Sequence, residues 1–254
     1  MNDAPQQLAL DLPHRSALGA EDFLVSGSNQ AAVAMIDRWP DWPHSAMAVV
    51  GPPGSGKSHL VNVWRSRSGA DVQEASDFTE DAVAQLSEKG AIVVENVDRG
   101  IADQRVLFHI LNVAAEQKLS VLLTSRVAPG ELDITLPDLR SRLRAAPVLN
   151  ISPPDETLLR ALLVKLFADR QLSVDPQVIS YLALRIERST EAVAKAVTEI
   201  DRLALASRRK VTRALVAEVL AQQVSDETDP DSPLSVTFVM ILSHNACHKL
   251  RLGA

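Results

Sequence analysis

One glycine-rich segment carries the residue types that bind phosphate groups. It fits the pattern G-x-x-x-x-G-K-[ST] and consists of Gly51, Pro52, Pro53, Gly54, Ser55, Gly56, Lys57 and Ser58. Backbone N–H groups in such a turn, at the positive end of a helix dipole, attract a polyphosphate. We therefore expect Lys57 to contact the β- and γ-phosphates and the Ser58 hydroxyl to bind Mg²⁺, with His59 beside them. The alternative is a surface turn that matches the pattern by chance.

A second apolar run, residues 91–94, leads into polar residues that would complete this site. Glu95 is expected to hold Mg²⁺ through water. Asn96 stands where an acid would orient the attacking water, and because an amide cannot take up a proton, we expect nucleotide binding with weak or no intrinsic hydrolysis. Asp98 takes the role of that missing acid if the turn after the strand folds it back toward the phosphates; otherwise it is a solvated acid. Thr124 ends another run and either lies near the γ-phosphate or is an ordinary strand-end residue.

Several elements must position these residues. Strand-like runs occur at residues 46–50, 91–94 and 120–124, with a weaker one at 147–151, and an amphipathic helix is expected at 104–113. This alternation predicts an α/β fold with a parallel sheet flanked by helices. Beyond Pro153 only helical patterns follow, including Asp175-Pro176 as a helix start and helices at 190–207 and 212–222. Four regions are therefore expected: a flexible segment at 1–20, the α/β domain at 21–152, a small all-helical domain at 153–223, and a linker with an unassigned tail at 224–254.

Composition narrows the possible partners and location. The chain has 254 residues, of which 46% are hydrophobic, so it can bury a full core. Its net charge of −6 lacks the basic character of a protein that holds DNA by its phosphates. Its single cysteine, Cys247, is consistent with a reducing compartment, and no stretch is long and apolar enough for a membrane helix. We expect a cytoplasmic protein with no membrane partner.

The order of these motifs resembles the AAA+ module of the bacterial replication initiator DnaA. Besides the phosphate loop and Glu95-Asn96, the resemblance rests on residues 124–126, 136–143 and 151–155, and it covers about residues 20–222. It implies an AAA+ P-loop parallel sheet followed by a helical lid domain. The initiator's N-terminal assembly region and its C-terminal DNA-binding domain are not expected here, because the residues after the lid are few and begin with an acidic stretch.

A short N-terminal pattern makes the resemblance more specific. Gln7, Leu8, Leu10 and Leu12 are similar to the peptides that dock on the replicative sliding clamp, with Asp11 where proline is more usual. Alternating leucines on a terminal segment can occupy a surface groove, although such a pattern can also pack on its own domain. Joined to an initiator-like AAA+ module without a DNA-binding domain, it resembles the Hda-type regulators of DnaA.

This resemblance implies control of the initiator's nucleotide state. A regulator bound to the DNA-loaded clamp would present Arg142 to ATP held by DnaA, and hydrolysis would leave the inactive ADP form. An arginine finger supplied in trans accelerates such reactions about 10³–10⁵-fold. Arg140 and Arg144 are nearby alternatives, and any of the three can be a solvated surface arginine.

The lid is expected to set the nucleotide preference. The family carries a phosphate-contacting arginine near the start of the third lid helix, and the corresponding residue here is Glu191, with Arg188 as a substitute close by. An acid near phosphates weakens triphosphate binding, so we predict that ADP binds more tightly than ATP. The resemblance also implies that adenine is enclosed near Phe23 and Val25.

Two other functions remain open at this stage. One is an autonomous P-loop ATPase of the motor or loader type, which would show turnover that depends on Lys57. The other is an initiator-like adaptor that recruits DNA or helicase, which would show salt-dependent DNA affinity. In the preferred function DNA is contacted only indirectly, through the clamp. Arginine fingers also imply side-by-side AAA+ packing, so a homodimer or larger oligomer is expected.

Overall fold

The computed structural model describes residues 24–77 and 79–228, with side chains described up to residue 222. Its centre is a five-stranded parallel sheet with the strand order β2-β3-β4-β1-β5. The strands are β1 (Ala46–Val50), β2 (Asp71–Glu74), β3 (Ala91–Glu95), β4 (Ser120–Ser125) and β5 (Val148–Asn150). The predicted parallel sheet is thus confirmed. The prediction did not include the edge strand β2, whose sequence Asp-Val-Gln-Glu has no apolar run.

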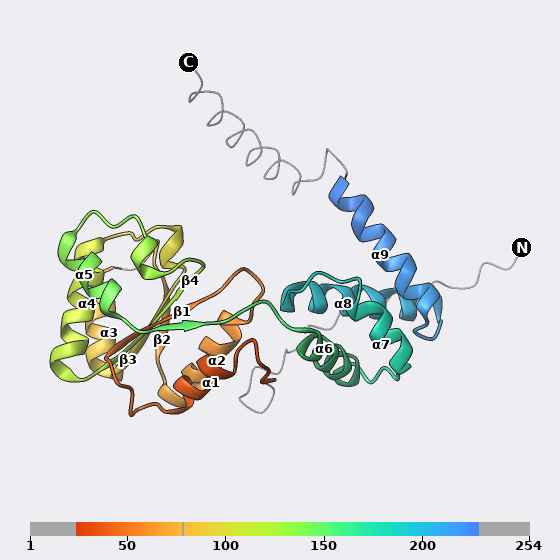
Figure 1. The fold of residues 1–254 in the computed structure, drawn as a ribbon, viewed down its shortest axis with the longest axis horizontal. Helices are drawn as coiled ribbons and strands as arrows, with labels where there is room; N and C mark the ends of the chain where they lie inside the picture. Colours follow the sequence, from red (N-terminus) through yellow and green to blue (C-terminus); the bar gives the residue numbers. More distant parts are fainter. Residues whose placement is uncertain (1–23, 78, 229–254) are drawn as a thin grey trace, which may run out of the picture. The chain divides into compact units, whose positions relative to one another are not determined.

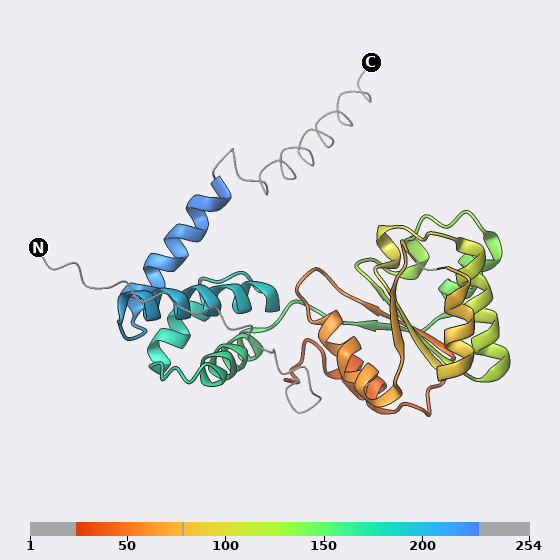
Figure 2. The same cartoon turned by 180° about the vertical axis from the view of Figure 1, so that it is seen from behind.

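Helices cover both faces of this sheet, as Figures 1 and 2 show from opposite sides. One face carries α1 (Gln30–Asp37) and α2 (Lys57–Ser68), and the other carries α3 (Asp81–Lys89), α4 (Gln104–Gln117) and α5 (Pro137–Ala145). The central strands are buried on both sides, so their residues alternate between two apolar cores. In β1, Met47 and Val49 pack in the core with α1 and α2, whereas Ala48 and Val50 pack in the other.

Local sequence explains where the crossover helix α4 begins. The Asp103 side chain caps it by accepting hydrogen bonds from the backbone N–H groups of Arg105 and Val106. The helix continues to Gln117, four residues past the expected end at Val113. Two short 3₁₀ turns, η2 (Val97–Arg99) and η3 (Pro129–Glu131), follow β3 and β4. The carboxyl ends of the strands, together with η2, therefore form one polar edge.

The second half of the chain is helical, as expected. It contains α6 (Glu156–Asp169), α7 (Pro176–Ala183), α8 (Thr190–Ser207) and α9 (Arg213–Thr228). Asp175 caps α7 and Pro176 is its first residue, which confirms the predicted start. Helix α9 runs past Val224, where the linker was expected to begin. No helix within the described ranges is long and apolar enough to cross a membrane.

The chain divides into two compact units. Among the described residues, one unit comprises the sheet, its covering helices and the chain up to Leu162, and it also includes the short segment Glu187–Val193. The other comprises Leu163–Ile186 and the chain from Ala194 onward. The first turn of α8 therefore belongs with the sheet, although the rest of that helix belongs to the helical unit.

Candidate nucleotide site

The glycine-rich segment connects β1 to α2 and passes close to other backbone. A Cβ on Gly51 would lie 2.4 Å from the Ile151 carbonyl oxygen, a distance that no real side chain allows. Gly54 has a φ of +66° and Gly56, which precedes α2, has a φ of +101°. Both angles are in the left-handed region, where glycine is favoured. The glycines thus permit a tight turn in front of a helix N-terminus, as a phosphate loop requires.

Lys57 lies inside this turn. Its ammonium group donates hydrogen bonds to the carbonyl oxygens of Gly51 at 2.7 Å and Pro52 at 2.9 Å. Partial burial lowers the pKa of Lys57, and this effect outweighs the opposing charge of Asp98, while the nearby cation Arg126 lowers the pKa further. Because Asp98 and Arg126 both affect the pKa of Lys57, its ammonium group lies near the charged residues that follow β3 and β4.

The two residues expected to bind Mg²⁺ are brought together. Ser58 lies close enough to the Glu95 carboxylate, which is half-buried at the end of β3, for its hydroxyl to lower the pKa of that group. Burial raises the pKa of Glu95, and the negative charge of Glu74 raises it further. A hydroxyl and a carboxylate are the hard oxygen ligands that Mg²⁺ uses, usually with several waters.

The loop also holds a buried hydroxyl that the protein itself does not use. Ser55 is 3% exposed, and its Oγ has no hydrogen-bond partner within the described part of the chain. Buried polar groups are normally paired, so this hydroxyl is available to a ligand. Together with the loop shape, Lys57 and the Ser58–Glu95 pair, it fits a polyphosphate with Mg²⁺. When bound, the nucleotide would supply the phosphoryl groups and Mg²⁺ would neutralise their charge.

Asn96 is held by neighbouring strands. It adopts a left-handed conformation with a φ of 57°, and its backbone N–H donates to the buried hydroxyl of Thr124 at 2.9 Å. Its side-chain amide donates to both carboxylate oxygens of Glu74, at 2.9 and 3.0 Å. Thr124 and Asn96 therefore link neighbouring strand ends, and the amide nitrogen of Asn96 is already bound to Glu74.

Asp98 is neither a solvated acid nor a free base. Its carboxylate accepts hydrogen bonds from the Arg126 guanidinium at 2.6 Å and from the Arg126 backbone N–H at 3.0 Å. Burial alone would raise the pKa of Asp98, but the hydrogen bonds and charge of Arg126 outweigh burial and hold that pKa below its ordinary value. Asp98 therefore stays ionised and paired, and it does not replace the acid that is missing at Asn96.

The first turn of α8 lies against the phosphate loop. Thr190 donates to the Gly54 carbonyl oxygen through its backbone N–H at 2.7 Å and through its hydroxyl at 3.0 Å. A Cβ on Gly54 would meet the Ser189 Cβ at 2.4 Å, so these backbones are in close contact. Arg188 and Glu191, which flank this pair, are both exposed. The two residues expected to influence phosphate binding thus lie one residue from contacts with the loop.

The remaining predicted nucleotide residues are less informative. His59 is partly buried in the first turn of α2. Val25 is 55% exposed, and Phe23 lies outside the described residues, so the expected adenine enclosure near them stays a prediction. The expected clamp-binding residues Gln7, Leu8, Leu10 and Leu12 also lie outside the described residues.

The arginines of α5 are displayed on the surface. Leu139 and Leu143 are fully buried and anchor one side of the helix, whereas Arg140, Arg142 and Arg144 are exposed. Positions four apart share a helix face, so Arg140 and Arg144 lie on one flank of the anchored side. Arg142 lies about 200° around the helix from Arg140. Within the described residues, Arg142 forms no ion pair.

Three features of the site were absent from the sequence prediction. Glu74 sits on the edge strand that was not predicted, in register with Glu95. Arg126 entered the sequence prediction only within residues 124–126, with no pairing to Asp98. The Ser189–Thr190 segment contacts Gly54, which lies 135 or more positions earlier in the chain. The only sequence signal for Glu74 was its place between a helix and the next strand, and this does not specify which strand its segment pairs with.

Comparisons with known proteins agree with this architecture. Residues 155–220 match the family model described as Hda, lid domain. The chain is 24% identical over 246 residues to the chromosomal replication initiator protein DnaA of Symbiobacterium thermophilum, covering 87% of this chain and 53% of that protein. It is 22% identical over 231 residues to DnaA of Cutibacterium acnes, covering 81% and 46%. The chain thus spans about half the length of the curated relatives it matches.

Solved structures show the same fold. Domain III of the Thermotoga maritima replication initiation protein DnaA superposes with a TM-score of 0.70 at 18% identity, covering 83% of this chain and 98% of that one. The AMPPCP-bound DnaA from Aquifex aeolicus superposes with a TM-score of 0.65 at 17% identity, covering 81% and 69%. The lid match and these likenesses agree: the chain is similar to Hda over residues 155–220 and to DnaA over most of its length, and it has the fold of the DnaA AAA+ module.

Proposed function

We propose that this protein binds ADP with Mg²⁺ and stimulates hydrolysis of ATP held by the initiator DnaA. The observation that carries the proposal is the combination of two features: a phosphate loop fitted to a nucleotide, and an exposed Arg142 on α5 that has no ion pair among the described residues. The lid match and the kinship with DnaA support a regulator of replication initiation. The solved relatives named as bound to AMPPCP support nucleotide binding.

The chemistry of the proposed reaction falls to Arg142. Its guanidinium is always charged and carries several N–H donors in a fixed plane, so it can neutralise charge that develops on the phosphoryl group of the partner's ATP. A surface arginine can do this only if no carboxylate of its own chain holds it. The exposure of Arg142 and its lack of an ion pair within the described part of the chain meet this requirement.

The chain's own nucleotide serves a structural role in this proposal. Asn96 cannot accept a proton and is bound to Glu74, and Asp98 is paired with Arg126, so neither is a free base beside the phosphates. Weak or absent intrinsic hydrolysis follows. The carboxylate of Glu191 next to the loop contact of Thr190 favours ADP, because one more phosphate would add repulsion.

Recruitment is assigned to the N-terminal pattern of Gln7, Leu8, Leu10 and Leu12, which would dock on the sliding clamp. Docking on a clamp loaded on DNA brings the regulator near the initiator without direct contact between the regulator and DNA. Side-by-side AAA+ packing with DnaA, or with a second copy of this chain, would present α5 to a neighbour's nucleotide.

The test is loss of initiator-bound ATP in a reconstituted mixture with DNA-loaded clamp. Arg142→Ala should lower the stimulated rate by about 10³-fold or more while leaving ADP affinity unchanged. Arg140→Ala is the matched control on the other flank of α5 and should retain most of the activity. If Arg142→Ala stimulates hydrolysis as well as the wild type, the assignment of the finger is wrong.

Docking can be separated from chemistry in the same assay. The double variant Leu8→Ala/Leu10→Ala should fail at low concentration and recover when the regulator is in large excess, because only recruitment is impaired. Arg142→Ala should not recover at any concentration. Equal activity of the double variant and the wild type at low concentration would remove the clamp from the proposal.

A further inference from the structure

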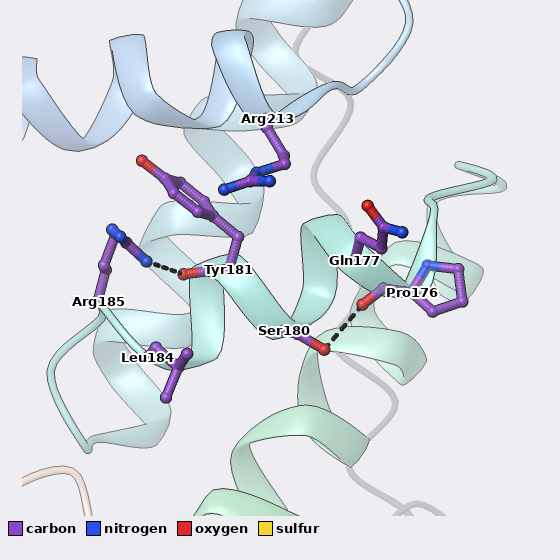
Figure 3. Close-up of a pocket in the computed structure, with 7 residues that line it drawn as sticks. All are labelled: Pro176, Gln177, Ser180, Tyr181, Leu184, Arg185 and Arg213. Atoms are coloured by element: carbon purple, nitrogen blue, oxygen red, sulfur yellow. Dashed lines mark hydrogen bonds between the residues drawn. The ribbon is translucent and has the colours of Figure 1, made fainter.

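A pocket of about 440 Å³ lies on the helical unit and is lined by none of the residues assigned to the nucleotide site. It is formed by α7, the two residues that follow it and the first residue of α9, and Figure 3 shows its lining side chains. Pro176, Tyr181 and Leu184 contribute apolar surface, and Arg185 and Arg213 contribute charge. Leu184 is 66% exposed, more than any other large apolar side chain that the structure describes.

Tyr181 holds the two cations in place. The Arg185 guanidinium carbon lies 3.9 Å from the centre of the Tyr181 ring, and that of Arg213 lies 4.9 Å from it. Figure 3 shows the two guanidinium groups on opposite sides of the ring. Arg185 also donates a hydrogen bond to the Tyr181 carbonyl oxygen at 3.3 Å. Cation–π contacts of this kind orient an arginine without neutralising its charge.

These two charges have no acidic partner among the described residues. Other arginines of the helical unit do: Arg170 pairs with Asp201, Arg202 with Glu199, and Arg209 with Glu218. The chain as a whole carries a net charge of −6, so acidic side chains outnumber basic ones. Two neighbouring guanidinium groups without a carboxylate therefore mark a place where negative charge from another molecule would be stabilised.

We propose that this pocket docks a segment of a partner protein that carries two carboxylates next to an apolar side chain. The Tyr181 ring separates the two guanidinium groups, so one carboxylate of the segment would bind to Arg185 and a second to Arg213, each through two parallel hydrogen bonds. The neighbouring apolar side chain would cover Leu184 and Pro176. This inference concerns a surface that the nucleotide site does not share, and it stands independently of the proposed function.

The observations favour a protein segment over a nucleic acid. Single strands bind by stacking bases on aromatic rings, but both faces of Tyr181 are already covered by guanidinium groups. Nucleic acids also require a row of cations along several phosphates, whereas this pocket presents two, beside exposed apolar surface. An acidic and apolar peptide matches both the charge and the surface.

The test uses the full chain and two fluorescent peptides of equal length, one alternating Asp and Leu, the other alternating Asn and Leu. By fluorescence anisotropy at low salt, the acidic peptide should bind at least about tenfold more tightly than the neutral one, and added salt should weaken it. Arg185→Gln/Arg213→Gln should lower its affinity about tenfold. Arg202→Gln is the matched control, because it removes an exposed arginine of the same unit outside the pocket.

Melting of each variant, followed by circular dichroism, separates lost binding from lost folding. Arg185→Lys/Arg213→Lys preserves charge and provides a second measurement if the glutamine variant melts early; it should retain part of the affinity. Equal binding of both peptides, or no binding of the acidic one to a folded wild type, would refute the proposal. Competition of the peptide by a thymidine oligonucleotide would favour nucleic acid instead. Self-association that the glutamine variant abolishes would identify a second copy as the occupant, which also overturns it.

Discussion

The carboxyl edge of the sheet and the exposed side of α5 differ in whether their charged side chains are bound to other groups of the chain. At the edge, Glu74 holds Asn96 and Asp98 holds Arg126, so polar groups are bound to one another across three strands. On α5, two buried leucines anchor a helix whose arginines are left exposed. A site that binds its own ligand needs its groups fixed beforehand, whereas a residue that acts on a neighbour must remain available.

This contrast matters for how the protein is expected to work. A bound nucleotide would meet a rigid edge with little freedom for a base to move, which suits retention better than turnover. A partner would meet a cation that has not yet been neutralised. The two regions should therefore respond independently to substitution, and the following predictions test that independence, beginning with the largest effect.

Lys57→Ala should separate the two regions most clearly. The Lys57 ammonium is the cation held within the loop, and losing a charge-assisted contact to a phosphate should weaken ADP binding about 100-fold. Isothermal calorimetry measures this affinity. Arg142→Ala is the control and should bind ADP as the wild type does. Weakened ADP binding in Arg142→Ala would show that the two regions are not independent.

Gly54→Ala should destabilise the protein through both its backbone conformation and a close contact. The new Cβ requires a left-handed backbone and meets Ser189 at 2.4 Å, so we expect the free energy of unfolding to fall by about 2–3 kcal/mol. Gly69→Ala is the matched control, because Gly69 has nearly the same φ, +68°, but no atom within 4 Å of the new Cβ. Its cost should be about 1 kcal/mol. Equal losses by urea denaturation would show that the Ser189 contact is unimportant.

Asp98→Asn tests how much the pair of Asp98 and Arg126 stabilises the sheet edge, measured as the free energy of unfolding at different pH values. The pKa of Asp98 is lower in the folded chain, so its pair with Arg126 stabilises the protein above the ordinary value of 3.8 and stops doing so as pH falls through the folded value. The variant should lose about 1–2 kcal/mol at pH 7, a modest amount because Arg126 is partly exposed. Below the folded pKa of Asp98 the two proteins should converge. A difference independent of pH would contradict this account.

Glu191→Gln should have the smallest effect. Removing one exposed negative charge beside the loop should raise ATP affinity about threefold relative to ADP affinity. Competition binding with both nucleotides measures the ratio. Glu187→Gln, also exposed but on the other side of the Ser189–Thr190 contact, is the control. An unchanged ratio, or a wild type that prefers ATP, would remove Glu191 from the explanation of nucleotide preference.

Much of the molecule could be predicted from local sequence. The phosphate loop is a contiguous pattern, β1 is an apolar run between polar residues, and α8 has the predicted bounds, Thr190–Ser207. These elements depend on backbone propensity, glycine geometry and apolar periodicity, which act over a few residues. The same reasoning placed Glu95 near the loop, and the structure brings its carboxylate close to Ser58.

Other features could not be read from the chain, because they depend on which strands become neighbours. β2 has no apolar run, so its pairing with β3, and with it the Glu74–Asn96 contact, appeared only in the folded sheet. The salt bridge of Asp98 and Arg126 joins residues 28 positions apart, and Thr190 reaches Gly54 across 136 positions. Sequence patterns determined the groups available for phosphate chemistry, and tertiary packing decided which of them are bound to each other and which remain exposed, because hydrogen bonds and burial depend on distance in space.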